Sequence, residues 1–410
     1  MTLATVSHIA PGKSSAASAQ SSAEPSADEC ISTADSAAVS AHKTMPAAAP
    51  TPEVTAAAPT PESAPVATTP ATSAAPTPAP TLTPTTSPFT DAEYESCELC
   101  PRRCHAHRNK GRTGFCGASN KLYIARAALH YWEEPPISGD AGSGAIFFTG
   151  CPLRCAFCQN FRISQEGFGK QISVARLAEI MLELQEQGAL NINLVTPLHY
   201  TPHVIEAVHM AKDAGLRLPI VCNTSGYERP ETIAEVAEII DIWLPDVKFA
   251  SSKLAKMLTG AADYPRFAFA ALSVMLDALR ARGGRKVEEE TGRMLQGIIV
   301  RHLVMPGHTD DSCKVLDRLW KLCHNEIDIS VMNQYTPNKV CKKAGGNLSH
   351  TLSNEEYELV LDHADDLGFD RMWWQQGGTV SESFIPEFDA TGVEGPELQL
   401  PAWQMLAAKA

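Results

Sequence analysis

The sequence predicts an α/β fold in which parallel strands are joined by crossover helices. Six apolar runs of strand length alternate with helical stretches between residues 145 and 367. That alternation indicates a parallel sheet with crossover helices. The runs are short and nearly continuous in apolar character, as buried parallel strands are. Periodicity alone does not separate a doubly wound sheet from a barrel, but in both cases chemistry belongs at the C-terminal ends of the strands.

Each predicted element follows from its residues. The strands are expected at 145–149, 191–196, 219–223, 242–248, 298–304 and 327–333, with a further short strand at 369–374. The helices are expected at 173–187, 202–214, 229–239, 251–258, 265–281, 310–324 and 354–367. Ser173 is suited to cap the first helix, and Gly188 follows its end. Pro245 has no N–H, so the fourth strand must have a bulge or a free edge there.

The chain divides by composition. Residues 1–90 are rich in Ala, Pro, Ser and Thr, contain 14 of the 29 prolines and have no aromatic residue before Phe89. Such a segment buries too little apolar surface to become ordered, so we expect a disordered, passive tail. A Cys-rich module at 91–123, the α/β domain at 124–380 and a C-terminal extension at 381–410 are expected to follow.

Charge and hydropathy exclude several classes of protein. The net charge is −13, and neither the first 95 residues nor the remaining 315 have, as a whole, the basic excess that nucleic-acid binding needs. No apolar run approaches the length that spans a bilayer, and the N-terminus has no apolar core of signal-peptide length. We therefore expect a cytoplasmic protein that binds neither nucleic acid nor a membrane. In that compartment its 12 cysteines are better interpreted as metal ligands than as disulfides.

The strongest motif directly follows the first strand. Cys151, Cys155 and Cys158 have the spacing C-x3-C-x2-C. Three thiolates on one tight loop can hold an iron–sulfur cluster and leave its fourth iron open for a substrate or cofactor. Zinc is the competing interpretation, but no fourth ligand stands at a suitable offset after Cys158.

A second group of cysteines lies in the Cys-rich module. Cys97, Cys100, Cys104 and Cys116 have the spacing C-x2-C-x3-C-x11-C, which predicts a closed site for zinc first and iron second. His105 and His107 are alternatives for one ligand. A module this small has little core, so a structural metal is favoured over an iron–sulfur cluster that relays electrons.

Polar residues end several of the predicted strands. Asp246 and Lys248 are costly to bury without partners or water, which favours a site. Arg301 and His302 point to opposite faces of their strand, and we expect Arg301 to face the interior. Further candidates follow other strands: Thr196, His199, Asn223, Ser225, Gln334 and Tyr335.

The Cys loop, with an aromatic residue before its third cysteine, resembles that of the radical SAM superfamily. More narrowly, the chain resembles pyruvate formate-lyase activating enzyme-like proteins over about residues 97–380. The segments that carry the resemblance are GSGAIFFTGCPLRCAFCQN, LVTPLHYTP, CNTSGYE, LPDVKF and IVRHLVMPGH. It implies a partial (β/α)6 TIM-like barrel, preceded by the Cys-rich metal-binding module and the disordered tail.

The resemblance also implies roles for residues. Cys151, Cys155 and Cys158 would hold a [4Fe–4S] cluster whose open iron chelates S-adenosylmethionine. Reduction of the sulfonium would give methionine and a 5′-deoxyadenosyl radical. Phe157 matches an aromatic residue beside the adenine. Asn223 and Ser225 stand where the family contacts ribose and carboxylate, and Arg301 would bind the methionine carboxylate. Where the family often has Gly-Gly-Glu, this chain has Thr196-Pro-Leu-His199, so these two side chains are the candidates for the amino group.

The implied partners are an electron donor such as flavodoxin or ferredoxin and a glycyl-radical enzyme, from whose glycine the radical would take hydrogen. Two alternatives stay open. One is a radical SAM reaction on a small molecule, and the other is a non-catalytic Fe–S redox protein.

Overall fold

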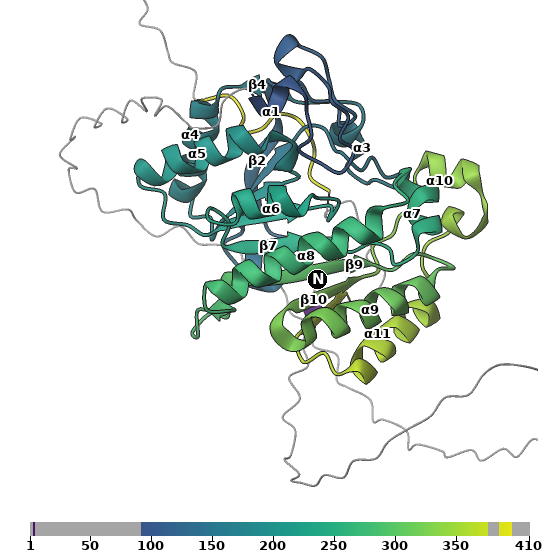
Figure 1. Cartoon of the computed structure of the whole chain (residues 1–410). Coiled ribbons are helices and arrows are strands. Elements are labelled where there is room, and N and C mark those ends of the chain that lie inside the picture. Colours follow the sequence, from purple (N-terminus) through teal and green to yellow (C-terminus); the bar gives the residue numbers. More distant parts are fainter. Residues whose placement is uncertain (1–2, 5–91, 376–384, 396–410) are drawn as a thin grey trace, which may run out of the picture. The chain divides into compact units, whose positions relative to one another are not determined.

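The structure, a computed structural model, describes residues 3–4, 92–375 and 385–395. Within these residues, one sheet has the strand order β1-β11-β10-β9-β7-β6-β5-β3-β2-β4, and β8 (Lys286–Val287) pairs with β9 (Figure 1). Most of the expected tail lies outside the described residues. The described part of this tail is β1 (Leu3–Ala4), a strand of two residues that pairs antiparallel with β11. The sequence does not indicate this strand.

The parallel part of the sheet is formed by the predicted strands. They are β3 (Ser143–Phe148), β5 (Ile192–Val195), β6 (Ile220–Thr224), β7 (Ile242–Pro245), β9 (Met294–Leu303), β10 (Asp328–Met332) and β11 (Met372–Gln375). Most boundaries differ from the prediction by one to four residues. The strand β7 ends at Pro245, and Asp246 then makes an isolated bridge to Arg301. The sheet thus loses regular pairing directly after the residue that cannot donate a hydrogen bond.

Strand order decides between the two architectures that the sequence leaves open. Each parallel strand pairs with the parallel strand that comes next in the chain, from β3 through β11. A doubly wound sheet would reverse direction at a switch point, and no reversal occurs here. The sheet also stays open, because β1 and β4 (Lys170–Ile172) are its two ends. The expected partial barrel is confirmed: six βα units followed by β11.

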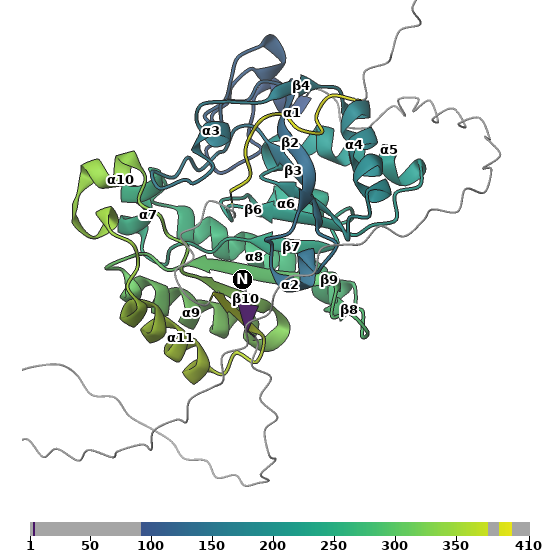
Figure 2. The same ribbon diagram turned by 180° about the vertical axis from the view of Figure 1, so that it is seen from behind.

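Helices cover one face of this sheet (Figure 1), and the strands are visible from the opposite side (Figure 2). The long ones are α4 (Val174–Glu186), α5 (Thr201–Asp213), α6 (Pro230–Val236), α7 (Ser252–Thr259), α8 (Tyr264–Ala281), α9 (Thr309–Cys323) and α11 (Asn354–Leu367). Ser173 caps α4 as predicted, since its hydroxyl accepts a 3.0 Å hydrogen bond from the Arg176 N–H. The helix α6 ends three residues earlier than expected.

Short helices connect these elements. They are α1 (Ala92–Glu95), α2 (Pro135–Ser138), α3 (Phe161–Ser164) and α10 (Lys339–Ala344), with 3-10 turns η1 (Arg108–Lys110), η2 (Leu198–Tyr200), η3 (His324–Glu326) and η4 (Gly346–Ser349). Among the described helices, none is both long and apolar enough to cross a bilayer.

One edge of the barrel is antiparallel and was not predicted. The strand β2 (Leu122–His130) pairs with β3 on one side and with β4 on the other. Residues 385–395, part of the expected C-terminal extension, lie along β2: Ala127 N–H donates to the Thr391 carbonyl at 2.8 Å. Phe388 packs edge-on against Phe147 of β3, with ring centroids 5.4 Å apart. The end of the described chain therefore completes this side of the barrel.

The N-terminal end of the barrel is closed by α2. Ile137 is fully buried and packs among apolar side chains of β6, β7 and β9. Its carbonyl accepts a 2.7 Å hydrogen bond from Asn191, which directly precedes β5. With this end filled, an opening into the barrel interior is left for the C-terminal ends of the strands.

Candidate active site

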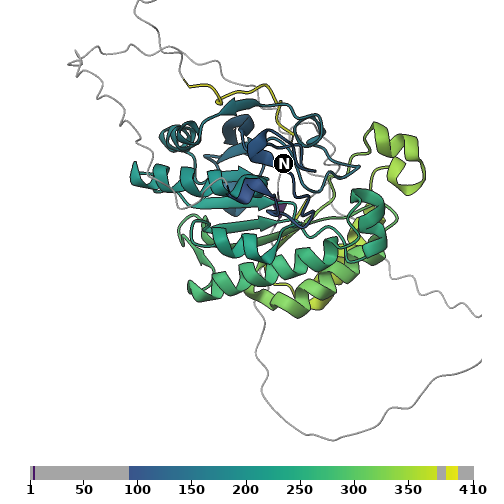
Figure 3. The ribbon, with the colours of Figure 1, turned by 45° about the horizontal axis from the view of Figure 1, so that its top comes forward.

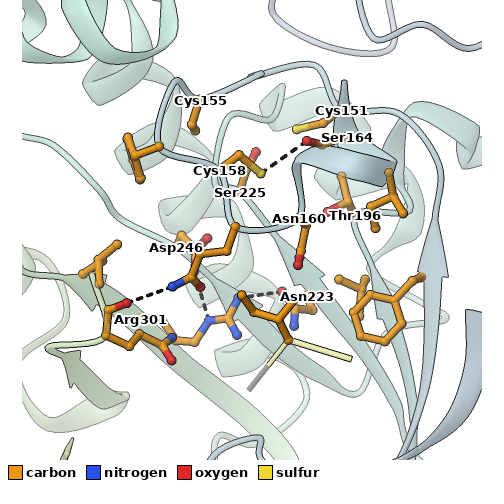
Figure 4. A pocket seen from close by; sticks show the side chains of 18 of the residues that line it. Cys151, Cys155, Cys158, Asn160, Ser164, Thr196, Asn223, Ser225, Asp246 and Arg301 are labelled. Carbon is orange, nitrogen blue, oxygen red and sulfur yellow. Dashed lines mark hydrogen bonds and ion pairs between the residues drawn. The ribbon is translucent and has the colours of Figure 1, made fainter. Parts of the chain in front are cut away.

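A cavity of about 220 Å³ lies at the C-terminal ends of the parallel strands (Figure 4). The Cys loop after β3 lines one side, and residues from the ends of β5, β6, β7, β9 and β10 line the other. Ten of the predicted site residues share this lining: Cys151, Cys155, Phe157, Cys158, Thr196, Asn223, Ser225, Asp246, Lys248 and Arg301. Gln334 and Tyr335 also line it. The structure thus brings these residues together, and the roles expected of them stay predictions.

Backbone constraints set the position of the Cys loop. Gly150 has φ +94°, and a Cβ added there would lie 2.7 Å from the Cys116 carbonyl oxygen. Only glycine combines this conformation with so close an approach. The next residue, Cys151, donates its N–H to the same carbonyl at 3.2 Å. The first cluster cysteine is thus fixed to the Cys-rich module.

The three thiols fit an iron–sulfur cluster by their chemistry. All line one cavity from one loop, and burial raises the pKa of the Cys151 thiol to about 12. The thiolate form therefore needs a strong positive charge beside it, which iron supplies. A cluster is larger than one ion and binds each thiolate at a different iron.

A network of buried charges faces the Cys loop across the cavity. Asp246 accepts from Lys248 at 2.5 Å and from Arg301 at 3.0 Å. Burial alone would raise the pKa of Asp246, but the two cations beside it hold the pKa below its ordinary value. Burial is likewise the largest influence on Lys248, yet Asp246 keeps the pKa of that ammonium above its usual value. All three groups are therefore charged at neutral pH.

Arg301 faces the interior, as predicted, and its guanidinium has protein partners on three nitrogens. Besides Asp246, it donates to Asn223 Oδ1 at 2.6 Å and to Glu133 at 3.4 Å. His302 points the other way, and its Nδ1 contacts the Val247 carbonyl oxygen at 2.7 Å. The expected contact between Arg301 and a substrate carboxylate stays a prediction, and it would compete with these partners.

Glu133 is a site residue that the sequence reasoning missed. It lines the cavity, is nearly buried, and accepts hydrogen bonds from Asn193 at 3.0 Å and Asn223 at 3.3 Å as well as from Arg301. The adjacent Glu134 is also buried, and burial raises the pKa of its carboxyl to about 7, against the lowering effect of Arg301. Glu133 thus connects Arg301 to Asn193 and Asn223 in the cavity wall.

Thr196 replaces the glycine that the family often has after this strand. Its φ is +59°, a conformation that β-branched residues rarely adopt. The Thr196 N–H donates to the Asn223 carbonyl at 2.7 Å, which connects the ends of β5 and β6. A strained residue at a cavity wall is typical of functional sites.

Two predicted residues have defined packing roles. Phe157 lines the cavity and packs edge-on against Phe249, with centroids 6.1 Å apart. His199 does not line the cavity. Its Nε2 lies 2.9 Å from the Thr149 carbonyl oxygen, and burial lowers the pKa of its ring to about 3. It is therefore a neutral histidine beneath the start of the Cys loop.

The Cys-rich module packs around a buried arginine. Arg108 donates to the carbonyls of Ser119 and His199, each at 2.7 Å, and to Cys97 Sγ at 3.6 Å. Its guanidinium also lies 4.4 Å from the Tyr94 ring centroid. Cys104 and Cys116 both lie beside Gly114. The burial of Arg108 could not be predicted, because nothing in its spacing distinguishes it from the other arginines of the module.

Comparisons with known proteins agree with this site. Residues 145–319 match the family model of the Radical SAM superfamily. The chain is 28% identical over 288 residues to an uncharacterized protein of Methanocaldococcus jannaschii, which covers 68% of this chain and 77% of that protein. It is 26% identical over 175 residues to a pyruvate formate-lyase-activating enzyme of Listeria monocytogenes, covering 40% of this chain and 63% of that enzyme. The chain thus spans less than two thirds of the Listeria enzyme.

Two solved structures match with lower sequence identity. Streptococcus suis SuiB matches with 14% identity and a TM-score of 0.40, over 58% of this chain and 49% of that one. Methylornithine synthase matches with 12% identity and a TM-score of 0.37, over 63% of this chain and 77% of that one. The family match spans β3 to α9 and contains the Cys loop and most of the cavity wall. Residues 145–319 therefore form a Radical SAM domain, and the chain is similar over part of its length to the pyruvate formate-lyase-activating enzymes of Listeria.

Proposed function

We propose that this radical SAM enzyme activates a glycyl-radical enzyme by taking a hydrogen atom from a glycine in a loop of that protein. The observation that carries the proposal is the cavity itself, where three thiols of one loop face a buried charge network. The likeness to the Listeria activating enzymes supports the glycine substrate.

Membership of the superfamily implies a [4Fe–4S] cluster and S-adenosylmethionine, and the residues present suit both. Cys151, Cys155 and Cys158 would hold the cluster. When bound, the cluster supplies one electron to the sulfonium of S-adenosylmethionine, which yields methionine and a 5′-deoxyadenosyl radical. The protein supplies a dry, charged wall for the zwitterionic methionine moiety. Lys248 and Asp246 are the groups of opposite charge on that wall.

The remaining wall suits the nucleoside. Phe157 offers an aromatic surface for the adenine, and Asn223 and Ser225 offer hydrogen-bonding groups for the ribose. Thr196 holds the place of the missing Gly-Gly-Glu motif. We infer that the methionine amino group binds near Thr196, since His199 lies outside the lining.

We further propose a second metal at Cys97, Cys100, Cys104 and Cys116. Arg108 is fully buried, and within the described residues none of its hydrogen bonds reaches a carboxylate. A buried cation needs an anion nearby. Four thiolates around zinc or around a cluster carry net negative charge and would meet that need. Zinc and a second iron–sulfur cluster both remain open as the occupant.

A small-molecule substrate is the second candidate, and one feature favours it. Ile385 and Pro386 line the cavity from the side, and the Gln159 amide donates to the Gln334 carbonyl at 2.8 Å across the rim. These two lining residues and the hydrogen bond between Gln159 and Gln334 leave less room for a protein loop to reach the cavity. The third candidate, a non-catalytic Fe–S redox protein, has no such feature in its favour.

The supply of electrons and the location of the protein complete the proposal. The reaction needs a one-electron donor, and a flavodoxin or a ferredoxin has the required chemistry. We place the protein in the cytoplasm, where thiols stay reduced and available as metal ligands.

The test is anaerobic incubation of the reduced, cluster-loaded protein with S-adenosylmethionine and candidate glycyl-radical enzymes of the same organism. The proposal predicts the doublet EPR signal of a glycyl radical on one candidate. If S-adenosylmethionine is cleaved but no candidate gains the signal, while a small metabolite accelerates cleavage, the small-molecule reaction replaces the proposal.

A further inference from the structure

An exposed aromatic residue of the Cys-rich module lies near two arginines, one from the module and one from the Cys loop. Phe115 is 41% exposed. The guanidinium of Arg102 lies 4.1 Å from its ring centroid, and that of Arg154 lies 5.6 Å away. We call these three residues the basic patch. Arginine and aromatic side chains are enriched among the residues that dominate protein–protein binding.

The module that carries this patch has the opposite charge to the rest of the chain. Between Cys97 and Tyr123 there are six Lys and Arg residues and one acidic residue, whereas the whole chain has a net charge of −13. Arg103, Lys110 and Arg112 are exposed members of this set. A local positive surface on an acidic protein attracts and orients a negatively charged partner.

The basic patch is directly connected to the Cys loop. Phe115 precedes Cys116, whose carbonyl accepts the N–H of Cys151 at 3.2 Å. Arg102 donates to the Pro152 carbonyl at 3.0 Å, and Arg154 lies inside the loop between the first two cluster cysteines. A single hydrogen bond therefore joins the backbone beside the patch to a cysteine that lines the cavity.

The patch and the cavity are different surfaces. Phe115, Arg102 and Arg154 do not line the cavity, which leaves the cavity to S-adenosylmethionine and the substrate. A protein bound at the patch would approach the Cys loop without entering the substrate's path. Electron delivery needs such an arrangement if the substrate is large.

We propose that the basic patch is the docking surface for a small acidic electron-carrier protein. This proposal rests on the proposed radical SAM reaction. In each turnover the carrier is oxidised by one electron and the cluster-loaded enzyme is reduced by one electron, and no atom is transferred. The negative surface of the carrier would pair with Arg154 and the arginines around it, and its cofactor edge would pack on Phe115.

The test compares two reductants for the same enzyme. One is an acidic flavodoxin reduced to its hydroquinone, and the other is methyl viologen reduced by dithionite, which needs no docking surface. Variants Arg154→Glu and Phe115→Ala alter the patch, and Arg217→Glu is the matched control. Arg217 is exposed and precedes β6, at the opposite end of the sheet from the Cys loop. The readout is the rate of 5′-deoxyadenosine formation at several flavodoxin and salt concentrations.

We expect Arg154→Glu to raise the flavodoxin concentration for half-maximal rate by roughly tenfold at low ionic strength, and the difference to shrink in high salt. Phe115→Ala should show a smaller increase that salt does not remove. Phe115→Ala and the control should match the unaltered protein with methyl viologen. For Arg154→Glu, the rate with flavodoxin is divided by the rate of the same variant with methyl viologen, which removes any effect of the substitution on the Cys loop. Unchanged flavodoxin dependence in both patch variants, or an equal loss in Arg217→Glu, would overturn the proposal. Absence of any cleavage by the unaltered protein with methyl viologen would instead contradict the proposed function.

Discussion

At the scale of single residues, the site is set by three cysteines and by a group of charges that neutralise one another. The thiols of Cys151, Cys155 and Cys158 are suited to iron because burial disfavours their charged form in the absence of a metal. Across the cavity, Asp246 is paired with both Lys248 and Arg301. Replacing one of these cysteines should therefore prevent cluster binding, and replacing one of these charged residues should leave another buried charge without its partner.

The first prediction concerns the cluster. Cys155→Ser should abolish the oxygen-sensitive cluster, since the loop offers no fourth thiol to replace the lost ligand. The barrel should stay folded, because the Cys155 side chain packs in a separate group of buried apolar residues under the loop and not in the main hydrophobic core. Anaerobic iron and sulfide analysis with EPR would measure the first effect, and circular dichroism the second. Unchanged iron content and signal in the variant would exclude Cys155 as a ligand.

The second prediction concerns the charge network. Asp246→Ala leaves the buried Lys248 and Arg301 without their shared carboxylate, which should lower the free energy of unfolding by about 3 kcal/mol. The double variant Asp246→Ala/Lys248→Met removes one of the stranded cations and should recover part of that loss. Urea denaturation of both variants gives the comparison. A double variant that is less stable than the single one would show that Lys248 does not depend on Asp246.

At the scale of elements, the connections between strands and helices carry the site. In the turn between β6 and α6, the backbone closely approaches the residue that follows β7. Gly226 has φ +76°, and a Cβ there would lie 2.0 Å from the Asp246 carbonyl oxygen. Two residues on, Glu228 is buried and accepts a hydrogen bond from Thr224 Oγ1 at 2.5 Å. This turn therefore holds the ends of β6 and β7 together beneath the cavity wall.

The third prediction follows from Glu228. Burial raises the pKa of its carboxyl from 4.5 to about 7. Between these two pH values the folded protein retains a proton that the unfolded chain has lost, so stability falls as pH rises through this window. The loss is complete above pH 7 and amounts to about 3 kcal/mol.

The measurement for Glu228 is thermal unfolding between pH 5 and pH 8. Glu228→Gln should flatten the decline and be more stable than the unaltered protein at pH 8. Glu238→Gln, an exposed change of equal charge in the same segment, should keep the decline. If the two variants have the same pH dependence, Glu228 is not the group responsible.

Several of these elements could be predicted from the sequence, and others could not, for identifiable reasons. The parallel strands are continuous apolar runs such as Ile242–Leu244, and the Cys loop follows one of them, so local pattern was enough. By contrast, Glu133 and Glu134 stand in a proline-containing segment that is typical of a surface turn. Only the antiparallel course of β2 carries that segment beneath the barrel. His199 could not be assigned either, because a polar residue after a strand can face the cavity or the backbone beneath it.

At the scale of the whole molecule, the described chain closes one end of the barrel and part of its side. The helix α2 fills the N-terminal end, and residues 385–395 lie along β2 beside the cavity. The Cys-rich module, in dark blue in Figures 1 and 3, supports the Cys loop through Gly150 and Arg102. Among the described residues, the cavity therefore lies at the end of the barrel that α2 does not fill.

The fourth prediction compares the two ends of the chain. Removing residues 1–88 should leave the melting temperature and the cleavage of S-adenosylmethionine unchanged, because the described part of this segment is a strand of two residues, β1. Removing residues 385–395 should lower the melting temperature, since Phe388 and the hydrogen bonds to β2 are lost. A drop of several degrees for the first deletion would show that the tail docks on the domain.

The proposed reaction of the cavity is the reductive cleavage of S-adenosylmethionine. The most direct measurement is chromatography of the products after anaerobic incubation of the reconstituted, dithionite-reduced protein with S-adenosylmethionine. If the cavity performs this reaction, the unaltered protein will give 5′-deoxyadenosine and methionine in equal amounts, and the Cys155→Ser variant will give neither product. Intact S-adenosylmethionine in the presence of a fully loaded, reduced cluster, or equal cleavage by Cys155→Ser, would contradict it.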